Sequence, residues 1–121
     1  MKLKTIGVLL LGVTDLDRSL HFYRDQLGMD VKWQIPGFAF LDGGGITFGL
    51  SQELAKSSAH TVGATEVVFA VENVRAAHAE LGGQGVEFFR EPRNVTGTEW
   101  AANFRDPDGH NLSIFGPEGK A

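Results

Sequence analysis

The chain has 121 residues, of which 42% are apolar and 21% charged, and its formal net charge is −4. This length predicts one compact domain over residues 1–121 with a proper hydrophobic core. The acidic balance and the lack of clustered Lys and Arg argue against a nucleic-acid partner. The absence of cysteine excludes disulfides, thiolate chemistry and cysteine-based metal sites.

The first predicted element is a buried strand over roughly residues 4–13, KTIGVLLLGV. Its apolar run is short, lacks a small-residue cleavage site and leads directly into a helix, so we interpret it as a strand and expect a cytoplasmic protein without a membrane partner. Asp15 is the expected N-cap of that helix, because a short side chain there accepts hydrogen bonds from free backbone amides. Gly28 is expected to end the helix. The apolar stripe of the helix consists of Leu16, Leu20, Tyr23 and Leu27.

Three further strands complete the first half, and the last two are joined by a glycine turn at residues 43–45. Residues 51–63, SQELAKSSAHTVG, are polar and lack strong periodicity, so they are interpreted as the connection between two halves. We place repeat one at about residues 1–52, the linker at about 53–63 and repeat two at about 64–121.

The second half repeats the order of the first. A strand over residues 64–71 is followed by Asn73 as N-cap and by a second helix with a stop at Gly82 and Gly83. The stripe of this helix consists of Val74, Ala77, His78 and Leu81. Three strands follow, and FRDPDGHNLSIF at residues 104–115 repeats the pattern of FLDGGGITFGLS in the first half. The chain is therefore predicted to be a duplicated β-α-β-β-β unit.

Two segments carry a resemblance to a known family, VTDLDRSLHFYRDQLG at residues 13–28 and FRDPDGHNL at residues 104–112. Together with the duplicated unit, they resemble the vicinal oxygen chelate superfamily, which includes glyoxalase I, extradiol dioxygenases, fosfomycin-modifying enzymes and bleomycin-resistance proteins. The resemblance covers nearly the whole chain. It implies an α+β fold in which two βαβββ repeats form an open, half-barrel mixed sheet around a shared cavity, with the helices on the outer face. It also implies a homodimer, in which the repeats pair within one chain or across the two.

The resemblance further implies four metal-ligand positions, which fall here on Val8, Gly49, Glu66 and Ser113. A divalent metal needs His or carboxylate donors, typically three or more from the protein. Of the four residues, Glu66 alone carries such a donor, so we expect neither a metal nor another cofactor. A displaced metal site that uses His60 or a residue of a second subunit is the alternative.

The cavity-facing residues follow from the expected hairpin register, in which Phe104 pairs with Asn111 and Trp100 with Phe115. Directly paired residues share a sheet face, and side chains alternate along each strand. A one-residue bulge would invert this assignment. The resulting candidate ligand-binding residues are Phe38, Phe40, Thr47, Glu66, Trp100, Phe104, Asn111, Ser113 and Phe115.

Glu66 is the candidate catalytic or anchoring residue and the only charge that we place on this surface. A carboxylate within the apolar strand ATEVVFAV is costly to bury without a partner. One interpretation is a relic of the metal position, solvated or paired with Arg90 or Arg105. The other is an anchor for a cationic or hydroxyl-bearing ligand, or a general base.

Three functions fit these features. The preferred hypothesis is a small-molecule binding protein of the glyoxalase/bleomycin-resistance type that lacks the usual metal site and sequesters an antibiotic or a metabolite. The second is a lyase, isomerase or dioxygenase of the same superfamily, with a non-standard metal site or with metal-free chemistry at Glu66. The third is a ligand-sensing or structural accessory module.

Overall fold

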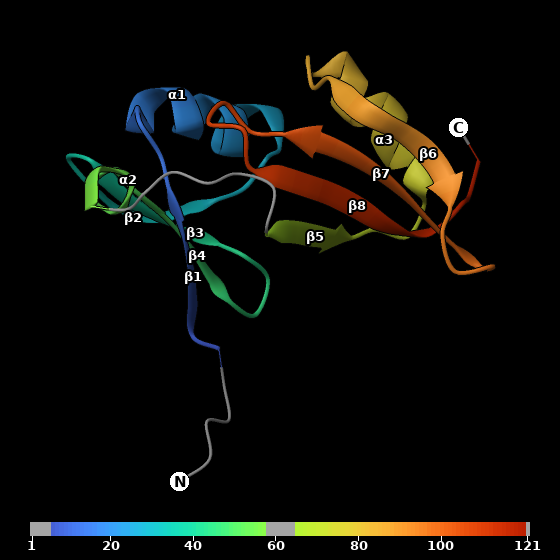
Figure 1. Ribbon diagram of the computed structural model, residues 1–121, viewed down its shortest axis with the longest axis horizontal. Helices are drawn as coiled ribbons and strands as arrows, with labels where there is room; N and C mark the ends of the chain where they lie inside the picture. Colours follow the sequence, from blue (N-terminus) through green and yellow to red (C-terminus); the bar gives the residue numbers. More distant parts are fainter. Residues whose placement is uncertain (1–5, 58–64, 121) are drawn as a thin grey trace, which may run out of the picture. The chain divides into compact units, whose positions relative to one another are not determined.

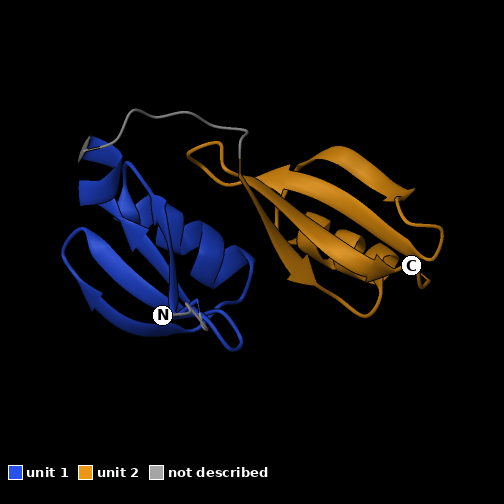
Figure 2. Cartoon of the chain, turned by 60° about the horizontal axis from the view of Figure 1, so that its bottom comes forward, with its two compact units in different colours: residues 1–60 blue, residues 61–121 orange. Residues whose placement is uncertain are grey.

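A computed structural model describes residues 6–57 and 65–120 of the chain. The chain divides into two compact units, residues 1–60 and 61–121 (Figure 2). His60 of the alternative metal site lies outside the described residues, as do most of the predicted linker and both outer ends of the chain. Each unit is described by itself.

The first unit has one four-stranded sheet in the order β1-β4-β3-β2 (Figure 1). β1 runs parallel to β4, and the other neighbours are antiparallel, so the sheet is mixed. Helix α1 continues directly into a π-helical segment, η1. The elements are β1 (Val8–Gly12), α1 (Leu16–Leu20), η1 (His21–Gln26), β2 (Val31–Ile35), β3 (Phe38–Asp42), β4 (Thr47–Ser51) and α2 (Gln52–Ser57).

The second unit repeats this topology in the order β5-β8-β7-β6, with β5 parallel to β8 (Figure 1). Both sheets are open rather than closed, which confirms the prediction of an α+β fold built from two βαβββ units. The elements are β5 (Glu66–Ala70), α3 (Val74–Gly83), β6 (Phe88–Asn94), β7 (Glu99–Arg105) and β8 (Asn111–Pro117).

Both predicted helix N-caps are confirmed. Asp15 Oδ1 accepts a hydrogen bond from the amide of Arg18 at 3.2 Å, and Asn73 Oδ1 accepts one from the amide of Ala76 at 2.9 Å. The first helix ends at Gly28, whose φ of 80° suits glycine. Helix α3 ends at Gly83, within the predicted glycine pair, and the positive φ of 92° follows at Gly85.

The polar segment after the first repeat forms a helix over residues 52–57, which its lack of strong periodicity did not predict. The hydroxyl of Ser51 accepts a hydrogen bond from the amide of Leu54 at 3.0 Å, which starts the first turn. Ala55 packs against Gly12, where a side chain would lie 3.1 Å from the backbone of Ala55. The helix is therefore held by capping and by close backbone packing, which leave no apolar periodicity in the sequence.

The two duplicated hairpins differ by one residue. The first closes with Phe40 opposite Gly49 and a two-residue loop at Gly44 and Gly45, both at positive φ. This pairing differs by two residues from the expected register, so Phe38, Phe40 and Thr47 stay on the predicted face. In the second, the amide of Asp106 donates to the carbonyl of His110 at 3.2 Å across a three-residue loop. The buried Asp106 carboxylate holds this loop, because its Oδ1 accepts from the amides of Asp108 at 3.0 Å and His110 at 2.8 Å.

The longer loop shifts the register of β7 against β8, so the predicted pairing of Phe104 with Asn111 and of Trp100 with Phe115 is wrong. Phe104 lies opposite Leu112, and Trp100 lies opposite Gly116. Since a shift of one residue turns every side chain to the other face, both aromatic residues lie on the face covered by α3.

One face of each sheet carries the core, packed under the helix of its own unit. In the first unit Tyr23 contacts Phe48 edge-on at a ring-centroid distance of 5.1 Å. The other face, which neither α1 nor α3 covers, is called the open face of each sheet. The buried core residues on the strands of the helix-covered faces are Leu11, Ala39, Leu41, Phe48, Leu50, Ala102, Phe104, Leu112 and Ile114.

Candidate functional site

The open face of the second sheet brings polar side chains from all four strands together. The register places them in three rows, because residues paired across strands share a face. Across β5, β8, β7 and β6, the rows are Glu66, Asn111 and Arg105, then Val68, Ser113, Asn103 and Arg90, then Ala70, Phe115, Ala101 and Arg93.

Glu66 is held by two neutral hydrogen-bond donors of β8. The hydroxyl of Ser113 donates to Oε2 at 2.8 Å, and Nδ2 of Asn111 donates to Oε1 at 3.3 Å. Ser113 is buried, whereas Glu66 is exposed. Within the described part of the chain, neither Arg90 nor Arg105 forms an ion pair with Glu66. The carboxylate is thus oriented by the sheet and accessible from outside.

The hydrogen bonds continue from Asn111 to the far edge of the sheet. Nδ2 of Asn103 donates to Oδ1 of Asn111 at 3.1 Å, and Nη2 of Arg93 donates to Oδ1 of Asn103 at 2.8 Å. Asn103 is 2% exposed, so its amide is fixed among these partners. One chain of hydrogen bonds therefore crosses all four strands from Arg93 on β6 to Glu66 on β5, a network that we call the polar row.

Glu66 is not the only charge on this face, so that prediction is wrong. Arg90, Arg93 and Arg105 lie on it as well. The pKa of the Arg93 guanidinium is lowered from its ordinary value, mainly by burial and next by the positive charge of Arg90, while Glu66 acts in the opposite direction. The guanidinium of Arg105 lies 4.1 Å above the ring centre of Phe89.

Two irregularities in β6 put two arginines on the same face. The pairing register of β6 shifts between Phe88 and Arg90 and again between Arg90 and Arg93. In a regular strand, residues three apart point to opposite faces, whereas an inserted residue restores them to one face. Pro92 lies between the two arginines, and proline is tolerated here because β6 is an edge strand. This bulged, proline-containing segment is the sequence signal that could have revealed the site.

Two candidate residues of the second half lie away from the polar row. Phe104 packs against Phe88 with ring centres 5.1 Å apart, and Phe88 packs against His78 of α3 at 4.5 Å. The guanidinium of Arg75, also on α3, lies 4.9 Å from the ring centre of Trp100. Both aromatic residues therefore belong to the helix-covered face, and the residue opposite Ser113 on the open face is Asn103.

The open face of the first sheet is aromatic and aliphatic. The register places Phe38, Phe40 and Thr47 on it, as predicted. The rings of Phe38 and Phe40 lie 4.9 Å apart, and that of Trp33 lies 6.0 and 5.9 Å from them. Trp33 is 49% exposed, which leaves ring area for contact with another molecule. The ligand-binding role of these residues stays a prediction.

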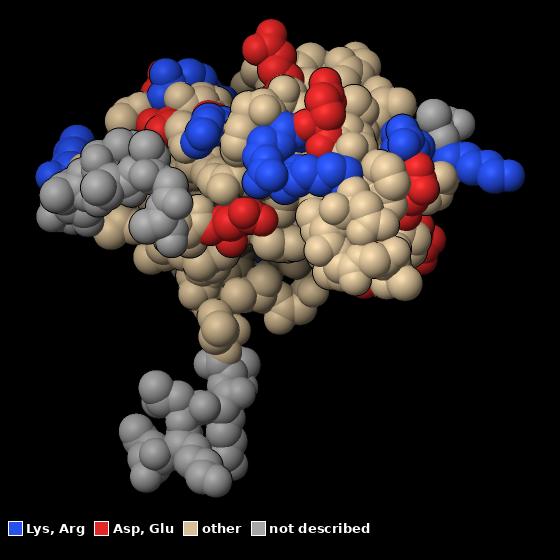
Figure 3. Space-filling view, turned by 45° about the vertical axis from the view of Figure 1, so that its right-hand side comes forward, with Lys and Arg blue, Asp and Glu red and all other residues tan. Residues whose placement is uncertain are grey.

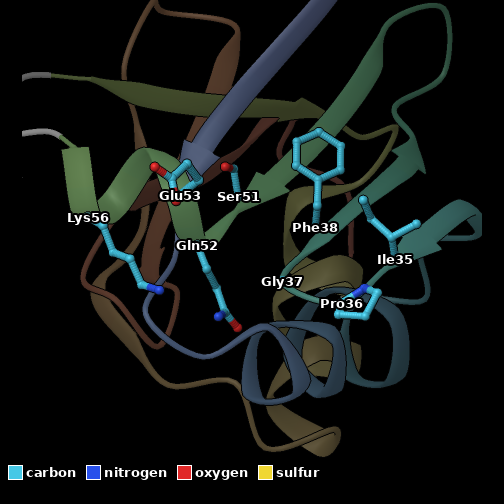
Figure 4. A pocket seen from close by; sticks show the side chains of 8 residues that line it. All are labelled: Ile35, Pro36, Gly37, Phe38, Ser51, Gln52, Glu53 and Lys56. Carbon is cyan, nitrogen blue, oxygen red and sulfur yellow. The ribbon is translucent and has the colours of Figure 1, made fainter.

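A pocket of about 470 Å³ opens beside Phe38 within the first unit (Figure 4). Figure 4 shows Gln52 and Lys56 extending from α2 in the same direction, with Phe38 and Ile35 across from them. Oε1 of Gln52 accepts a hydrogen bond from the amide of Leu16 at 2.7 Å, which fixes this side chain. The pocket is lined by Ile35, Pro36, Gly37, Phe38, Ser51, Gln52, Glu53 and Lys56.

The described residues contain no group of three or more His, Asp or Glu side chains placed to hold a metal ion. Nε2 of His78 pairs with Oε2 of Glu91 at 2.7 Å, and Nδ1 of His21 pairs with Oδ2 of Asp25 at 3.3 Å. Gly49 is closely covered, since a side chain there would collide with Leu10. The expectation of a metal-free site stays a prediction.

Comparison with protein families gives a match over residues 5–114 to the model described as the glyoxalase/bleomycin resistance protein/dioxygenase superfamily. The chain belongs to this superfamily. A relative from Bacillus subtilis strain 168, "Uncharacterized protein YraH", is 31% identical, and the match covers 93% of this chain and 94% of the relative.

Two solved structures have a fold similar to that of this chain. A lactoylglutathione lyase from Agrobacterium tumefaciens is 19% identical, with a TM-score of 0.80 over 98% of this chain and 97% of that chain. TnmS3, an antibiotic binding protein from Streptomyces sp. CB03234, is 21% identical, with a TM-score of 0.80 over 97% and 98%. At these identities the likeness shows the fold alone.

In the described ranges, no helix of this protein is long and apolar enough to cross a bilayer.

Proposed function

We propose that the protein binds a small organic molecule on the open face of the second sheet, as a member of its superfamily without the usual metal site. The binding would sequester an antibiotic or a metabolite. One observation carries the proposal: both carboxylate oxygens of Glu66 accept hydrogen bonds from the sheet, while the group itself is exposed. An oriented polar group on a face with apolar neighbours is typical of small-molecule sites.

The surroundings of Glu66 favour binding through both polar and apolar contact. Val68 and Phe115 lie in the neighbouring rows and supply apolar area, while the polar row supplies hydrogen-bonding groups of known orientation. The carboxylate has lone pairs beyond the two that Ser113 and Asn111 use, so it can accept from a ligand without losing them. The structural likeness to an antibiotic binding protein supports the same function.

An enzyme is the second candidate, supported by the exposure of Glu66 and by the likeness to a lactoylglutathione lyase. In that case Glu66 acts as a general base, because it is the exposed carboxylate at the end of an oriented hydrogen-bond chain. The reaction would be that of a lyase, isomerase or dioxygenase. Stoichiometric iron, zinc, nickel or manganese in the purified protein would favour this candidate over a binding protein.

A metal-free site predicts that chelation has no effect on stability. Three of the four family positions, Val8, Gly49 and Ser113, offer no His or carboxylate donor. The melting temperature in EDTA should therefore equal that in buffer, as measured by differential scanning calorimetry. A drop of several degrees in EDTA, reversed by added zinc or iron, would reveal an ion that holds the fold together.

Glu66→Gln should weaken ligand binding while leaving the fold intact. The amide oxygen still accepts from Ser113, so the melting temperature should change little. Affinity for a ligand found by thermal-shift screening of antibiotics and metabolites should fall by about 1.5–3 kcal/mol, the contribution of a hydrogen bond to a charged group. Titration calorimetry measures the change. Glu72→Gln, an exposed change in the same unit, is the matched control. Equal affinities of the two variants would place the ligand elsewhere.

The proposal includes a homodimer in the cytoplasm. The dimer is supported by the exposed apolar side chains of the first unit, which a second copy would bury. These side chains are Ile6, Val8, Leu10, Trp33 and Ile35, with exposed fractions of 73%, 45%, 42%, 49% and 46%.

A further inference from the structure

The three arginines on the open face of the second sheet are not neutralised by carboxylates. Among the residues that the structure describes, Arg90, Arg93 and Arg105 form no ion pair. Figure 3 shows one face of the molecule, on which Lys and Arg side chains lie beside one another and near Asp and Glu side chains. Guanidinium groups without a carboxylate partner are ready to bind an anion.

Arg93 is fixed in place by neutral acceptors and keeps donors for a ligand. Nη2 donates to Asn103 Oδ1 at 2.8 Å, and Nη1 donates to the carbonyls of Ala101 at 3.3 Å and Glu91 at 3.5 Å. A guanidinium has five N–H groups. The remaining donors, on Nε and Nη2, match the two oxygens that a carboxylate presents in a bidentate pair.

Arg90 adds a second positive charge beside this group. It lies opposite Asn103 in the pairing of β6 with β7, and its charge acts on Arg93. Like charges held side by side in a folded protein repel each other, and a bound anion removes that repulsion. The electrostatic repulsion between Arg90 and Arg93 is therefore offset when a carboxylate is bound.

Glu66 lies on β5, three strands away from Arg93 on β6. The backbones of these two strands are about 14 Å apart, at about 4.8 Å per strand. The side chains of Glu66 and Arg93 extend toward each other along the polar row. The amides of Asn103 and Asn111 therefore separate the two charged groups. A ligand that reaches both needs its acidic group and its hydrogen-bond donor several bonds apart.

We infer that the ligand is an organic acid whose carboxylate binds Arg93 and Arg90 and whose hydroxyl or ammonium group, several bonds away, donates to Glu66. This inference rests on the proposed function and narrows it. It also narrows the expected cationic or hydroxyl-bearing ligand to one that carries an acidic group, because three arginines on one face repel a cation that has no acidic group.

The test uses three aromatic probes of similar shape. para-Hydroxymethylbenzoate has the carboxylate and the distant hydroxyl, para-hydroxymethylbenzamide lacks the charge, and para-toluate lacks the hydroxyl. Dissociation constants are measured by NMR titration, which also follows the Nε–H signals of Arg90 and Arg93. The benzoate should bind at least about tenfold more tightly than the benzamide, which equals about 1.4 kcal/mol. It should also shift both arginine signals.

Variants assign the two ends of the ligand. Arg93→Gln should weaken the benzoate about tenfold and leave the benzamide unchanged, whereas Glu66→Gln should weaken the benzoate but not para-toluate. Arg90→Gln removes a charge without removing any hydrogen bond to a described residue, so it separates loss of charge from disturbance of the sheet. Arg18→Gln, an exposed change on α1, is the control for net charge.

The outcomes distinguish this inference from the proposed function. The inference that the ligand is an organic acid is overturned if benzoate and benzamide bind equally. It is also overturned if the arginine signals do not shift up to the solubility limit of the benzoate. If Glu66→Gln still weakens the screened ligand in that case, the proposed function stands. If the screened ligand is affected neither by Glu66→Gln nor by Arg93→Gln, both are overturned.

Discussion

Phe104→Ala should lower the free energy of unfolding by about 3–5 kcal/mol, the usual cost of truncating a fully buried phenylalanine. Phe104 is 1% exposed and packs against Phe88 beneath α3. The cavity left behind would be enclosed by the sheet and the helix, so little of the lost contact would be recovered. Urea denaturation followed by circular dichroism measures the loss.

Phe115→Ala is the matched control, because the same side chain is removed from the open face of the same sheet. Phe115 is half-buried and lies opposite Ala101, in the row that also holds Arg93. Its truncation should cost about 1–2 kcal/mol, in proportion to the smaller area buried. The difference between the two variants tests the register directly. A larger loss at Phe115 than at Phe104 would contradict the pairing of Phe104 with Leu112.

Much of the fold could be predicted because local sequence signals, such as helix caps and turn glycines, determine it. Asp15 and Asn73 are N-caps in the structure for the reason that made them recognisable, a short acceptor followed by an apolar stripe. The face assignment in the first hairpin was also predictable, although its adjacent glycines, Gly44 and Gly45, set a pairing two residues away from the expected one. The duplicated topology followed from these signals appearing twice.

The polar row could not be predicted, because it depends on two departures from regular pairing. One is the additional loop residue of the second hairpin, which turns Asn103 toward Ser113. The other is the pair of irregularities in β6, which bring Arg90 and Arg93 to one face. Neither changes the number of strands, so strand patterns alone give the right topology with the wrong side chains on the open face.

Asp106 explains why two hairpins of similar sequence close differently. The first hairpin has Asp42 at the matching position, and its Oδ1 accepts one hydrogen bond, from the amide of Gly44 at 2.9 Å. Asp106 is 5% exposed and accepts two, from the amides of Asp108 and His110. The second bond fixes His110 at the end of the three-residue loop, opposite Asp106, and Gly109 takes the positive φ of 91° that such a loop requires.

Asp106→Ala should therefore lower the free energy of unfolding by about 1–3 kcal/mol, since two loop amides lose their acceptor. Asp106→Asn keeps an oxygen at the same place and should cost about 1 kcal/mol or less. Urea denaturation gives both values, and amide hydrogen exchange along β7 and β8 shows whether the strands remain paired. Exchange should accelerate in the alanine variant at His110 and Asn111 first, because these residues directly follow the loop and begin the pairing of β8 with β7. If the asparagine variant is as unstable as the alanine variant, the loop is not held by these hydrogen bonds, and another cause must place Asn103 opposite Ser113.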